Sequence, residues 1–214
     1  CLRSAREVRA TSRSHDRPHI LEVMGRNCGD IALRTAIASH AEVCLVPEVP
    51  WSVEEVARRL QEAIDMGDSS ALIVVAEGAY ESMADFDVYG LLMAQGKQCF
   101  PGEPMTAHRL ADCLKYMCKD ADGHRAEVRA TVVGYTQRGD SPTTFDAVFA
   151  FESGNMAVKL LLEGKENLVI GIKQNRMFSM PISQALEMQR DIKGHFNRAQ
   201  YDTIQDMNSA LPTR

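Results

Sequence analysis

The stretch Ala71–Ala76 reads Ala-Leu-Ile-Val-Val-Ala, an unbroken apolar run with no side chain suited to facing water. A run this short predicts a β-strand buried on both faces, which is typical of a parallel sheet covered by helices. Two further apolar segments, His19–Met24 and Val43–Val46, predict strands of the same kind. Helical patterns separate the three strands, and this alternation indicates βαβ units and an α/β fold with a mostly parallel sheet.

The segment between the second and third strands has the plainest helical signals. Ser52 and Glu55 are spaced as a capping box. Apolar residues then recur at helical spacing up to Gly67: Val53, Val56, Leu60 and Ile64. The other expected elements are the end of an amphipathic helix after Cys1, a helix over 29–39, two helical stretches within about 80–120 around a loop at 100–102, a strand over 127–133, a helix over 143–162, a strand over 168–172, and helices near 183–193 and 198–209.

Charge and hydropathy exclude two classes of partner. Lys and Arg total 24 against 29 Asp and Glu, a formal net charge of −5, whereas a dedicated nucleic-acid binder is normally basic. No apolar run approaches the roughly 18 residues that a membrane span needs. We therefore expect neither a nucleic acid nor a membrane as a partner.

The six cysteines are scattered and contain no CxxC pair, which favours reduced thiols in a cytoplasmic protein. The pairs His15/His19 and Cys113/Cys118 could each be half of a metal site, but neither has a second half, so we expect no metal ligands. The first residue is Cys1 rather than Met. A lipoprotein processed at Cys1 and a chain cut from a longer one both fit, and the helical pattern that follows favours truncation.

Polar or glycine-containing segments follow three of the expected strands: Gly25-Arg26-Asn27, Glu77-Gly78 and Gly134–Gly139. Ligands of open α/β sheets bind outside the carboxyl ends of the strands, so these segments predict a ligand site. Arginine and glycine are also common in ordinary loops, and spacing alone leaves that reading open.

Several blocks together resemble one enzyme family. They are Thr11–Arg17, Glu22–Asp30 with its Met-Gly-Arg motif, Val46-Pro47-Glu48, Val75–Gly78, and Arg129–Gly139 with its Gln-Arg-Gly motif. Their order and spacing, over nearly the whole chain, resemble the C-terminal part of a bacterial-type, ATP-dependent 6-phosphofructokinase. The Met-Gly-Arg and Gln-Arg-Gly blocks are highly specific together, whereas a lone Met-Gly-Arg is a weak signal.

The resemblance implies binding of fructose 6-phosphate, which the family phosphorylates at its 1-hydroxyl. Arg17 and Arg129 match arginines that reach the sugar's 6-phosphate across a subunit interface. Tyr135 and Arg138 match the pair that binds the same phosphate from within the subunit. Guanidinium groups suit a phosphate dianion because they donate in pairs. A site shared between subunits implies a homo-oligomer, a tetramer for the full-length enzyme.

Other positions match contacts to the sugar itself. Met24, Gly25 and Arg26 match the loop beside the reacting end of the sugar, and Glu77 matches the carboxylate that accepts hydrogen bonds from its hydroxyls. Tyr135 stands where many family members have His. Tyrosine still donates a hydrogen bond to phosphate but cannot become cationic.

The catalytic half of the family pattern is missing. The chain has no two adjacent glycines, hence no GGDG-type loop for the ATP phosphates, and no TIDND-type segment with the catalytic aspartate. The sugar hydroxyl then lacks its general base and the nucleotide lacks its backbone N–H cradle. We expect no catalytic residue in this chain and no turnover by it, with ATP and Mg²⁺ bound only by the full-length enzyme. Asp140 replaces a common second glycine after Gly139, and we expect its carboxylate to point outward.

The effector site of regulated bacterial members is altered as well. Arg9 and Glu42 match two of its positions, Glu42 as a magnesium contact. The lysine-rich turn of the family is here Met66–Ser70, which contains no lysine. We therefore expect weak or absent regulation by a nucleoside diphosphate or phosphoenolpyruvate.

The family fold has two α/β domains, each three-layered with helices on both faces of a mostly parallel sheet. By resemblance, residues 1–136 form the fructose 6-phosphate-binding domain, 137–190 return to the missing ATP-binding domain, and 191–214 pack back on the first. The second domain is then incomplete and exposes apolar residues: Leu160, Leu161, Leu162 and Val169.

The main prediction is the C-terminal part of an ATP-dependent 6-phosphofructokinase, a cytoplasmic, allosteric enzyme of glycolysis. A pyrophosphate-dependent relative is the near alternative, since the donor is chosen chiefly in the missing half. A stand-alone sugar-phosphate-binding or regulatory protein without catalysis is a second alternative. A generic α/β domain with coincidental motifs is the third.

Overall fold

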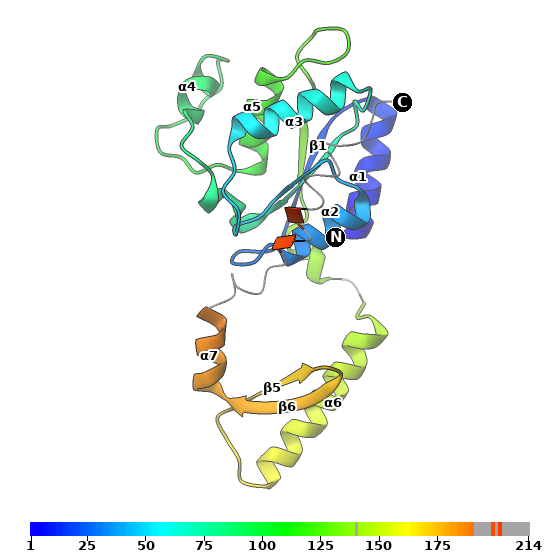
Figure 1. The fold of residues 1–214 in the computed structure, drawn as a ribbon, viewed down its shortest axis with the longest axis vertical. Coiled ribbons are helices and arrows are strands. Elements are labelled where there is room, and N and C mark those ends of the chain that lie inside the picture. The colour runs from blue at the N-terminus through cyan, green and yellow to red at the C-terminus, as the bar shows by residue number, and fades with distance from the viewer. Residues whose placement is uncertain (140, 191–197, 200, 203–214) are drawn as a thin grey trace. The chain divides into compact units, whose positions relative to one another are not determined.

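The computed structural model describes residues 1–139, 141–190, 198–199 and 201–202. The chain divides into two compact units, Cys1–Gln137 with the described part of 196–214, and the described part of Arg138–His195. Each unit has a sheet of its own, with four strands in the first and two in the second (Figure 1).

A parallel sheet forms the centre of the first unit. Its strands are β1 (His19–Val23), β2 (Val43–Leu45), β3 (Leu72–Ala76) and β4 (Arg129–Val132), in the order β2-β3-β1-β4. Every residue of β3 is buried, as its apolar run predicts. β4 lies at an edge of the sheet, and its Arg129 and Val132 are exposed. The expected α/β class and parallel pairing are confirmed.

Helices cover both faces of this sheet. The connection from β1 to β2 contains α2 (Asp30–Ser39) and crosses the sheet in one direction, whereas the connections containing α3 (Val53–Asp65) and α5 (Ala107–Met117) cross it in the other. Crossovers between parallel strands are right-handed, so α2 lies on one face and α3 and α5 on the other. The first helix, α1 (Leu2–His15), packs against α2, and α3 packs against α5 (Figure 1). The three-layer arrangement is confirmed.

The capping and packing of α3 follow its sequence pattern. The Ser52 hydroxyl accepts a hydrogen bond from the Glu55 N–H at 3.2 Å, which satisfies one free donor of the first turn. The apolar stripe faces the core and is buried: Val53, Val56, Leu60 and Ile64.

The segment after β3 is less helical than the sequence suggests. It starts as a 3-10 helix, η1 (Glu77–Ser82), and continues with the short α4 (Val88–Met93) before a long loop leads to α5. The Asp87 carboxylate caps α4 by accepting the Gly90 N–H at 2.8 Å, and Gly96 has a positive φ just past the end of α4. The expectation of a longer first helix was wrong, because Asp87 has a non-helical backbone as the N-cap of α4 and Gly96 follows the end of that helix with a positive φ.

The second unit contains a long helix and a hairpin. The helix, α6 (Thr144–Leu162), begins at a capping box formed by Thr143 and Asp146. The strand β5 (Leu168–Lys173) pairs antiparallel with β6 (Arg176–Pro181), and α7 (Ile182–Arg190) follows. Sequence pattern predicts β5 but not β6. The turn between them, Gln174-Asn175, has no glycine to mark it, although both residues have positive φ angles, 51° and 59°.

No residue of α6 is buried. Leu161 is 68% exposed, Leu162 84% and Val169 39%, while Leu160 is half-buried. The second unit therefore has apolar surface that its own described elements do not cover.

Tyr201, near the C-terminus, packs on the first unit. It is 7% exposed and its hydroxyl donates to the Cys44 carbonyl at 3.0 Å. Residues 198–199 and 201–202 are helical. The end of the helix expected near 183–193, most of the one near 198–209, most of the 191–214 segment and Asp140 lie outside the described residues. All six cysteines are free thiols, and no helix in the described part of the chain is both long and apolar enough to cross a membrane.

Candidate functional site

Three chain segments meet at one edge of the four-stranded sheet. The strands β3, β1 and β4 are neighbours and run parallel, so their carboxyl ends lie at the same edge. The segments that leave them are η1, which starts at Glu77, the loop from Met24 to Gly29, and a second 3-10 helix, η2 (Gly134–Arg138). These are the segments that the sequence marks as candidate ligand-binding loops.

The loops after β1 and β3 are joined through their backbones. The Gly78 N–H donates to the Gly25 carbonyl at 3.2 Å. A Cβ at Gly78 would overlap the Arg26 carbonyl oxygen and lie 2.6 Å from its carbon. Gly25 has a φ of +147°, and a Cβ there would lie 2.6 Å from the Cys28 carbonyl oxygen. Gly78 requires glycine because its backbone touches that of Arg26, and Gly25 requires glycine because of its positive φ and the nearby Cys28 carbonyl.

The loop after β1 is joined to η2 by a side chain. The Met24 N–H donates to the Gln137 Oε1 at 2.9 Å. Sequence reasoning assigns no role to Gln137, and the only available signal is its place inside the Gln-Arg-Gly block.

The segment after β2 fixes the far end of the same loop. The Gly29 N–H donates to both carboxylate oxygens of Glu48, at 2.8 and 3.1 Å. These two bonds hold Gly29, the residue before α2, against the segment that follows β2.

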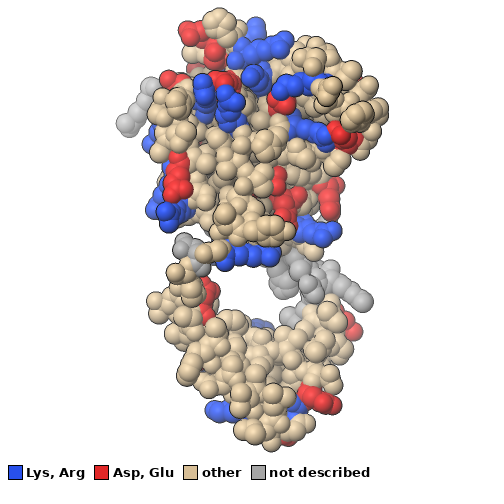
Figure 2. All heavy atoms as spheres, turned by 180° about the vertical axis from the view of Figure 1, so that it is seen from behind, with Lys and Arg blue, Asp and Glu red and all other residues tan. Residues whose placement is uncertain are grey.

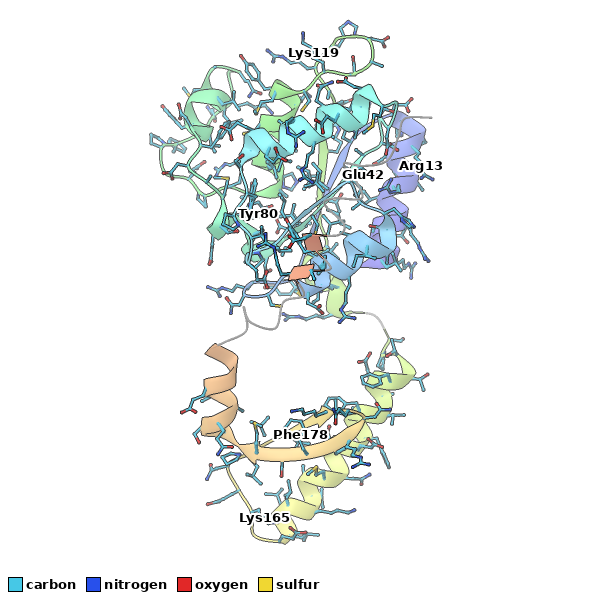
Figure 3. The ribbon with its side chains drawn as sticks, in the orientation of Figure 1. Arg13, Glu42, Tyr80, Lys119, Lys165 and Phe178 are labelled. Carbon is cyan, nitrogen blue, oxygen red and sulfur yellow. The ribbon has the colours of Figure 1, made fainter. Side chains whose placement is uncertain are left out.

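Two aromatic side chains hold η1 in place. The Tyr80 hydroxyl donates to the Glu22 carboxylate at 2.8 Å (Figure 3 labels Tyr80). Burial, reinforced by this carboxylate, raises the pKa of Tyr80 far above its ordinary value, so Tyr80 remains a donor. The Trp51 indole N–H donates to the Ala79 carbonyl at 2.7 Å, and its ring meets the edge of Tyr80.

The charged and polar groups of this edge point to solvent. Arg26, Glu77 and Tyr135 are exposed, Tyr135 to 85%. Arg138, the last residue of η2, is exposed and is the first residue of the second unit. Of the expected ligand contacts, the structure brings five together in the first unit: Met24, Gly25, Arg26, Glu77 and Tyr135.

Arg17 and Arg129 lie at the opposite edge of the sheet. Arg129 opens β4 in register with His19 at the start of β1, and Arg17 precedes that strand. The five-residue β1 separates them from the Met24 loop, a span of about 16 Å at the usual rise per residue. Within one chain, these two arginines do not join the other candidate residues.

Glu127 partners both arginines. Arg17 Nε lies 2.6 Å from a Glu127 carboxylate oxygen, and Arg129 forms an ion pair with the other oxygen.

Burial, and then the positive charge of Arg129, lowers the pKa of His19, whose Nε2 lies 2.8 Å from the Thr131 hydroxyl.

A cavity of about 460 Å³ adjoins Arg17 and Glu127, and its other polar lining residues are His15, Asp16, Ser69, Asp120 and Asp122. Acidic and basic side chains alternate across the face of the first unit in Figure 2, so no single sign of charge dominates that face.

The two expected effector residues form an ion pair that joins α1 to the residue before β2. The Arg9 guanidinium donates to both carboxylate oxygens of Glu42, at 3.0 and 3.1 Å, and to the His40 carbonyl at 2.6 Å. The Leu72 N–H donates to the same carboxylate at 2.5 Å (Figure 3 labels Glu42). Burial raises the pKa of Glu42, and Arg9 opposes this shift. These partners occupy Glu42 within the fold.

Among the described residues, the half-buried Asp120 and the exposed Asp122 and His124 form a group of potential metal ligands, with ligand atoms within 4.8 Å of one another. The Asp120 carboxylate already accepts the N–H groups of Asp122 and His124, at 3.0 and 2.8 Å. These hydrogen bonds stabilise the turn, and they explain why the three side chains lie close together without a metal.

The carboxyl edge has the chemistry to hold a ligand with hydroxyl groups and an anionic group. The Glu77 carboxylate can accept hydrogen bonds from hydroxyls, and the Tyr135 phenol and Arg26 guanidinium can donate to an anion. The hydrogen bonds between the three loops fix the positions of the backbone atoms that bear these side chains.

Comparison with known proteins shows which family this chain resembles. A family model described as Phosphofructokinase matches residues 1–161. The ATP-dependent 6-phosphofructokinase 1 of Clostridium perfringens is 38% identical over 202 residues, which cover 94% of this chain and 52% of that protein. The ATP-dependent 6-phosphofructokinase of Finegoldia magna is 36% identical over 190 residues, covering 87% of this chain and 49% of the relative. The chain spans about half the length of these curated relatives.

Solved structures give the same fold. Phosphofructokinase from Saccharomyces cerevisiae matches with a TM-score of 0.68 and 26% identity, over 96% of this chain and 25% of that one. A pyrophosphate-dependent phosphofructokinase from Marinobacter aquaeolei matches with a TM-score of 0.58 and 23% identity, over 86% of this chain and 43% of that one.

Proposed function

The chain belongs to the phosphofructokinase family, and from this we propose that it supplies the sugar-phosphate-binding part of an ATP-dependent 6-phosphofructokinase. That enzyme transfers the γ-phosphate of ATP to the 1-hydroxyl of fructose 6-phosphate, a step of glycolysis. The observation that carries the proposal is the meeting of three loops at the carboxyl ends of adjacent parallel strands, the place where open α/β sheets bind ligands.

Each group at this edge has a role in the proposal. Met24, Gly25 and Arg26 lie beside the reacting end of the sugar, and Glu77 accepts hydrogen bonds from its hydroxyls. Tyr135 and Arg138 bind the 6-phosphate, Arg138 through a paired guanidinium contact.

Arg17 and Arg129 complete the site of a second copy. Their place at the opposite edge of the sheet prevents them from reaching the ligand of their own chain, so a shared site requires an oligomer. Closed symmetry then gives each copy the pair that it lacks, and we infer a homotetramer for the full-length enzyme. Glu127 uses one nitrogen of each guanidinium, which leaves the other N–H groups of both arginines to donate to a phosphate.

We propose that ATP and Mg²⁺ bind at residues other than Gly25, Gly78 and Glu42. A nucleotide cradle needs open backbone at a glycine-rich turn, whereas the space at Gly78 is filled by the Arg26 backbone and that at Gly25 by Cys28. Both oxygens of Glu42 are committed to Arg9. We also propose that phosphoryl transfer depends on residues outside this chain, and that effector regulation through Arg9 and Glu42 is weak or absent.

The same reasoning divides the chain into parts. We assign residues 1–136 to the fructose 6-phosphate-binding domain, 137–190 to the ATP-binding domain, and 191–214 to a segment that packs on the first domain. The apolar surface of α6 and β5 is then the surface that the rest of the ATP-binding domain covers. Six free thiols are the reason to place the protein in a reducing compartment, the cytoplasm.

A stand-alone sugar-phosphate-binding protein is the second candidate. The first unit has a continuous core of its own, so it can bind a ligand without carrying out chemistry. Coding DNA upstream of Cys1 separates the two candidates. An in-frame GGDG-type loop and TIDND-type segment favour the enzyme, whereas a stop codon with neither motif favours the binding protein.

Calorimetric titration of the chain with fructose 6-phosphate tests the site itself. Binding of fructose 6-phosphate, with none of fructose at the same concentrations, is the expected result. Arg138→Ala should weaken binding at least about tenfold, because a charge-assisted bond to phosphate contributes about 1.5–3 kcal/mol. Arg58→Ala is the matched control, since Arg58 pairs with Glu55 and Glu62 on α3. Equal affinity for fructose and its phosphate would refute the proposal.

A further inference from the structure

The hydrogen-bond ladder between β1 and β4 stops one step short of Met24. The Val133 N–H donates to the Glu22 carbonyl at 3.0 Å, and in a regular parallel ladder the next bond would run from the Met24 N–H to the Val133 carbonyl. The chain turns away first. Gly134 has a φ of +55°, and the Val133 carbonyl instead accepts the Thr136 hydroxyl at 2.6 Å.

The side chain of Gln137 supplies the acceptor that the backbone withdraws. Its Oε1 accepts the Met24 N–H at 2.9 Å, in place of the Val133 carbonyl. The oxygen must face Met24, because an N–H can only donate. We propose that Gln137 is a positioning residue, which couples the loop beside the sugar to the segment that binds its phosphate.

The coupling extends across all three loops of the edge. The Gly25 carbonyl accepts the Gly78 N–H, and Gly78 directly follows Glu77. The Glu77 segment, the Met24 loop and η2 are therefore linked by two hydrogen bonds in series. The bond of Gln137 is the one made by a side chain, so a substitution can remove it without altering any backbone group.

This inference rests on the proposed function of the edge, and it predicts a difference between two ligands. Fructose 6-phosphate contacts several segments at once, so it gains from loops that are already held in register. Inorganic phosphate needs only the phosphate-binding segment. Loss of the Gln137 bond should therefore weaken the sugar phosphate selectively.

Three variants of the full chain test the coupling. Gln137→Met keeps the side-chain length but removes the acceptor, and Gln137→Glu keeps an acceptor. Gln61→Met is the matched control, because Gln61 Oε1 accepts the Lys119 N–H at 2.8 Å on α3. Titration calorimetry with fructose 6-phosphate and with inorganic phosphate gives the affinities. Amide hydrogen exchange at Met24, followed by NMR, reports the bond itself.

Gln137→Met should weaken fructose 6-phosphate binding about fivefold, the equivalent of one neutral hydrogen bond, and leave phosphate binding within about twofold. Its Met24 amide should exchange at least about tenfold faster. Gln137→Glu should keep that amide protected, and Gln61→Met should change neither ligand's affinity nor the Met24 exchange rate.

Unchanged fructose 6-phosphate affinity in Gln137→Met, in a chain whose parent binds the sugar, would overturn the coupling. Equal losses for both ligands would also overturn it, since they indicate general loosening of the fold. Absence of sugar binding by the unaltered chain is a separate result, which refutes the proposed function and with it the coupling.

Discussion

Gly78→Ala should loosen the carboxyl edge of the sheet at a single defined point. The new Cβ would stand 2.6 Å from the Arg26 carbonyl carbon and closer still to its oxygen, whereas carbon atoms pack at about 3.5–4.0 Å. The Arg26 backbone must therefore retreat by at least about 1 Å, since the oxygen is the nearer contact. Overpacking of this kind costs about 1–3 kcal/mol, and loss of the Gly78–Gly25 bond adds about 1 kcal/mol. We expect the free energy of unfolding of the first unit to fall by about 2–4 kcal/mol.

Urea unfolding followed by tryptophan fluorescence measures this change. Trp51 is the single tryptophan of the chain, and its indole bonds to Ala79, the residue after Gly78. Gly154→Ala is the control, because Gly154 lies in α6 with open space at its Cβ position. It should leave the Trp51 transition unchanged. A Gly78→Ala transition within about 0.5 kcal/mol of the parent would show that the two backbones do not touch as described.

Three further predictions concern the first unit. Ser52→Ala should lower its free energy of unfolding by about 1 kcal/mol in urea titrations, since the Glu55 N–H loses its cap. The pKa of His19 is lowered from its ordinary value of 6.5, so the unfolded state binds a proton that the folded state resists. Stability should therefore fall as the pH drops below about 6.5, and His19→Gln should remove that part of the pH dependence. Burial raises the pKa of Cys44 and of Cys113 to about 12, so iodoacetamide should label these two thiols only after unfolding, as read by mass spectrometry.

Local sequence signals carried much of the fold. The apolar run of β3 and the apolar stripe of α3 correctly predicted which faces are buried. The spacing of residues along a strand or helix decides which side chains share a face. The same spacing argument failed for β6. Its turn, Gln174-Asn175, has positive φ angles but contains no glycine, so the sequence lacks the usual signal of a hairpin turn.

The candidate site was predictable in its parts. Glycines at 25 and 78, Arg26 and Glu77 stand at strand ends, where a parallel sheet binds ligands. Gln137 was not predictable in this way. Its role depends on the withdrawal of the Val133 carbonyl from the ladder, which is a consequence of backbone geometry at Gly134.

The sequence by itself determined the α/β class, the four strands of the parallel sheet and the loops that follow them, because periodicity and strand ends are local properties. Only the tertiary structure decided which loops meet. The order β2-β3-β1-β4 places the segment after β4 beside the Met24 loop, although more than a hundred residues separate them in the chain. Arg17 and Arg129 lie at the far edge because they stand at the starts of β1 and β4, which run parallel. Strand order is set by how helices pack across the whole sheet, and no local pattern encodes it.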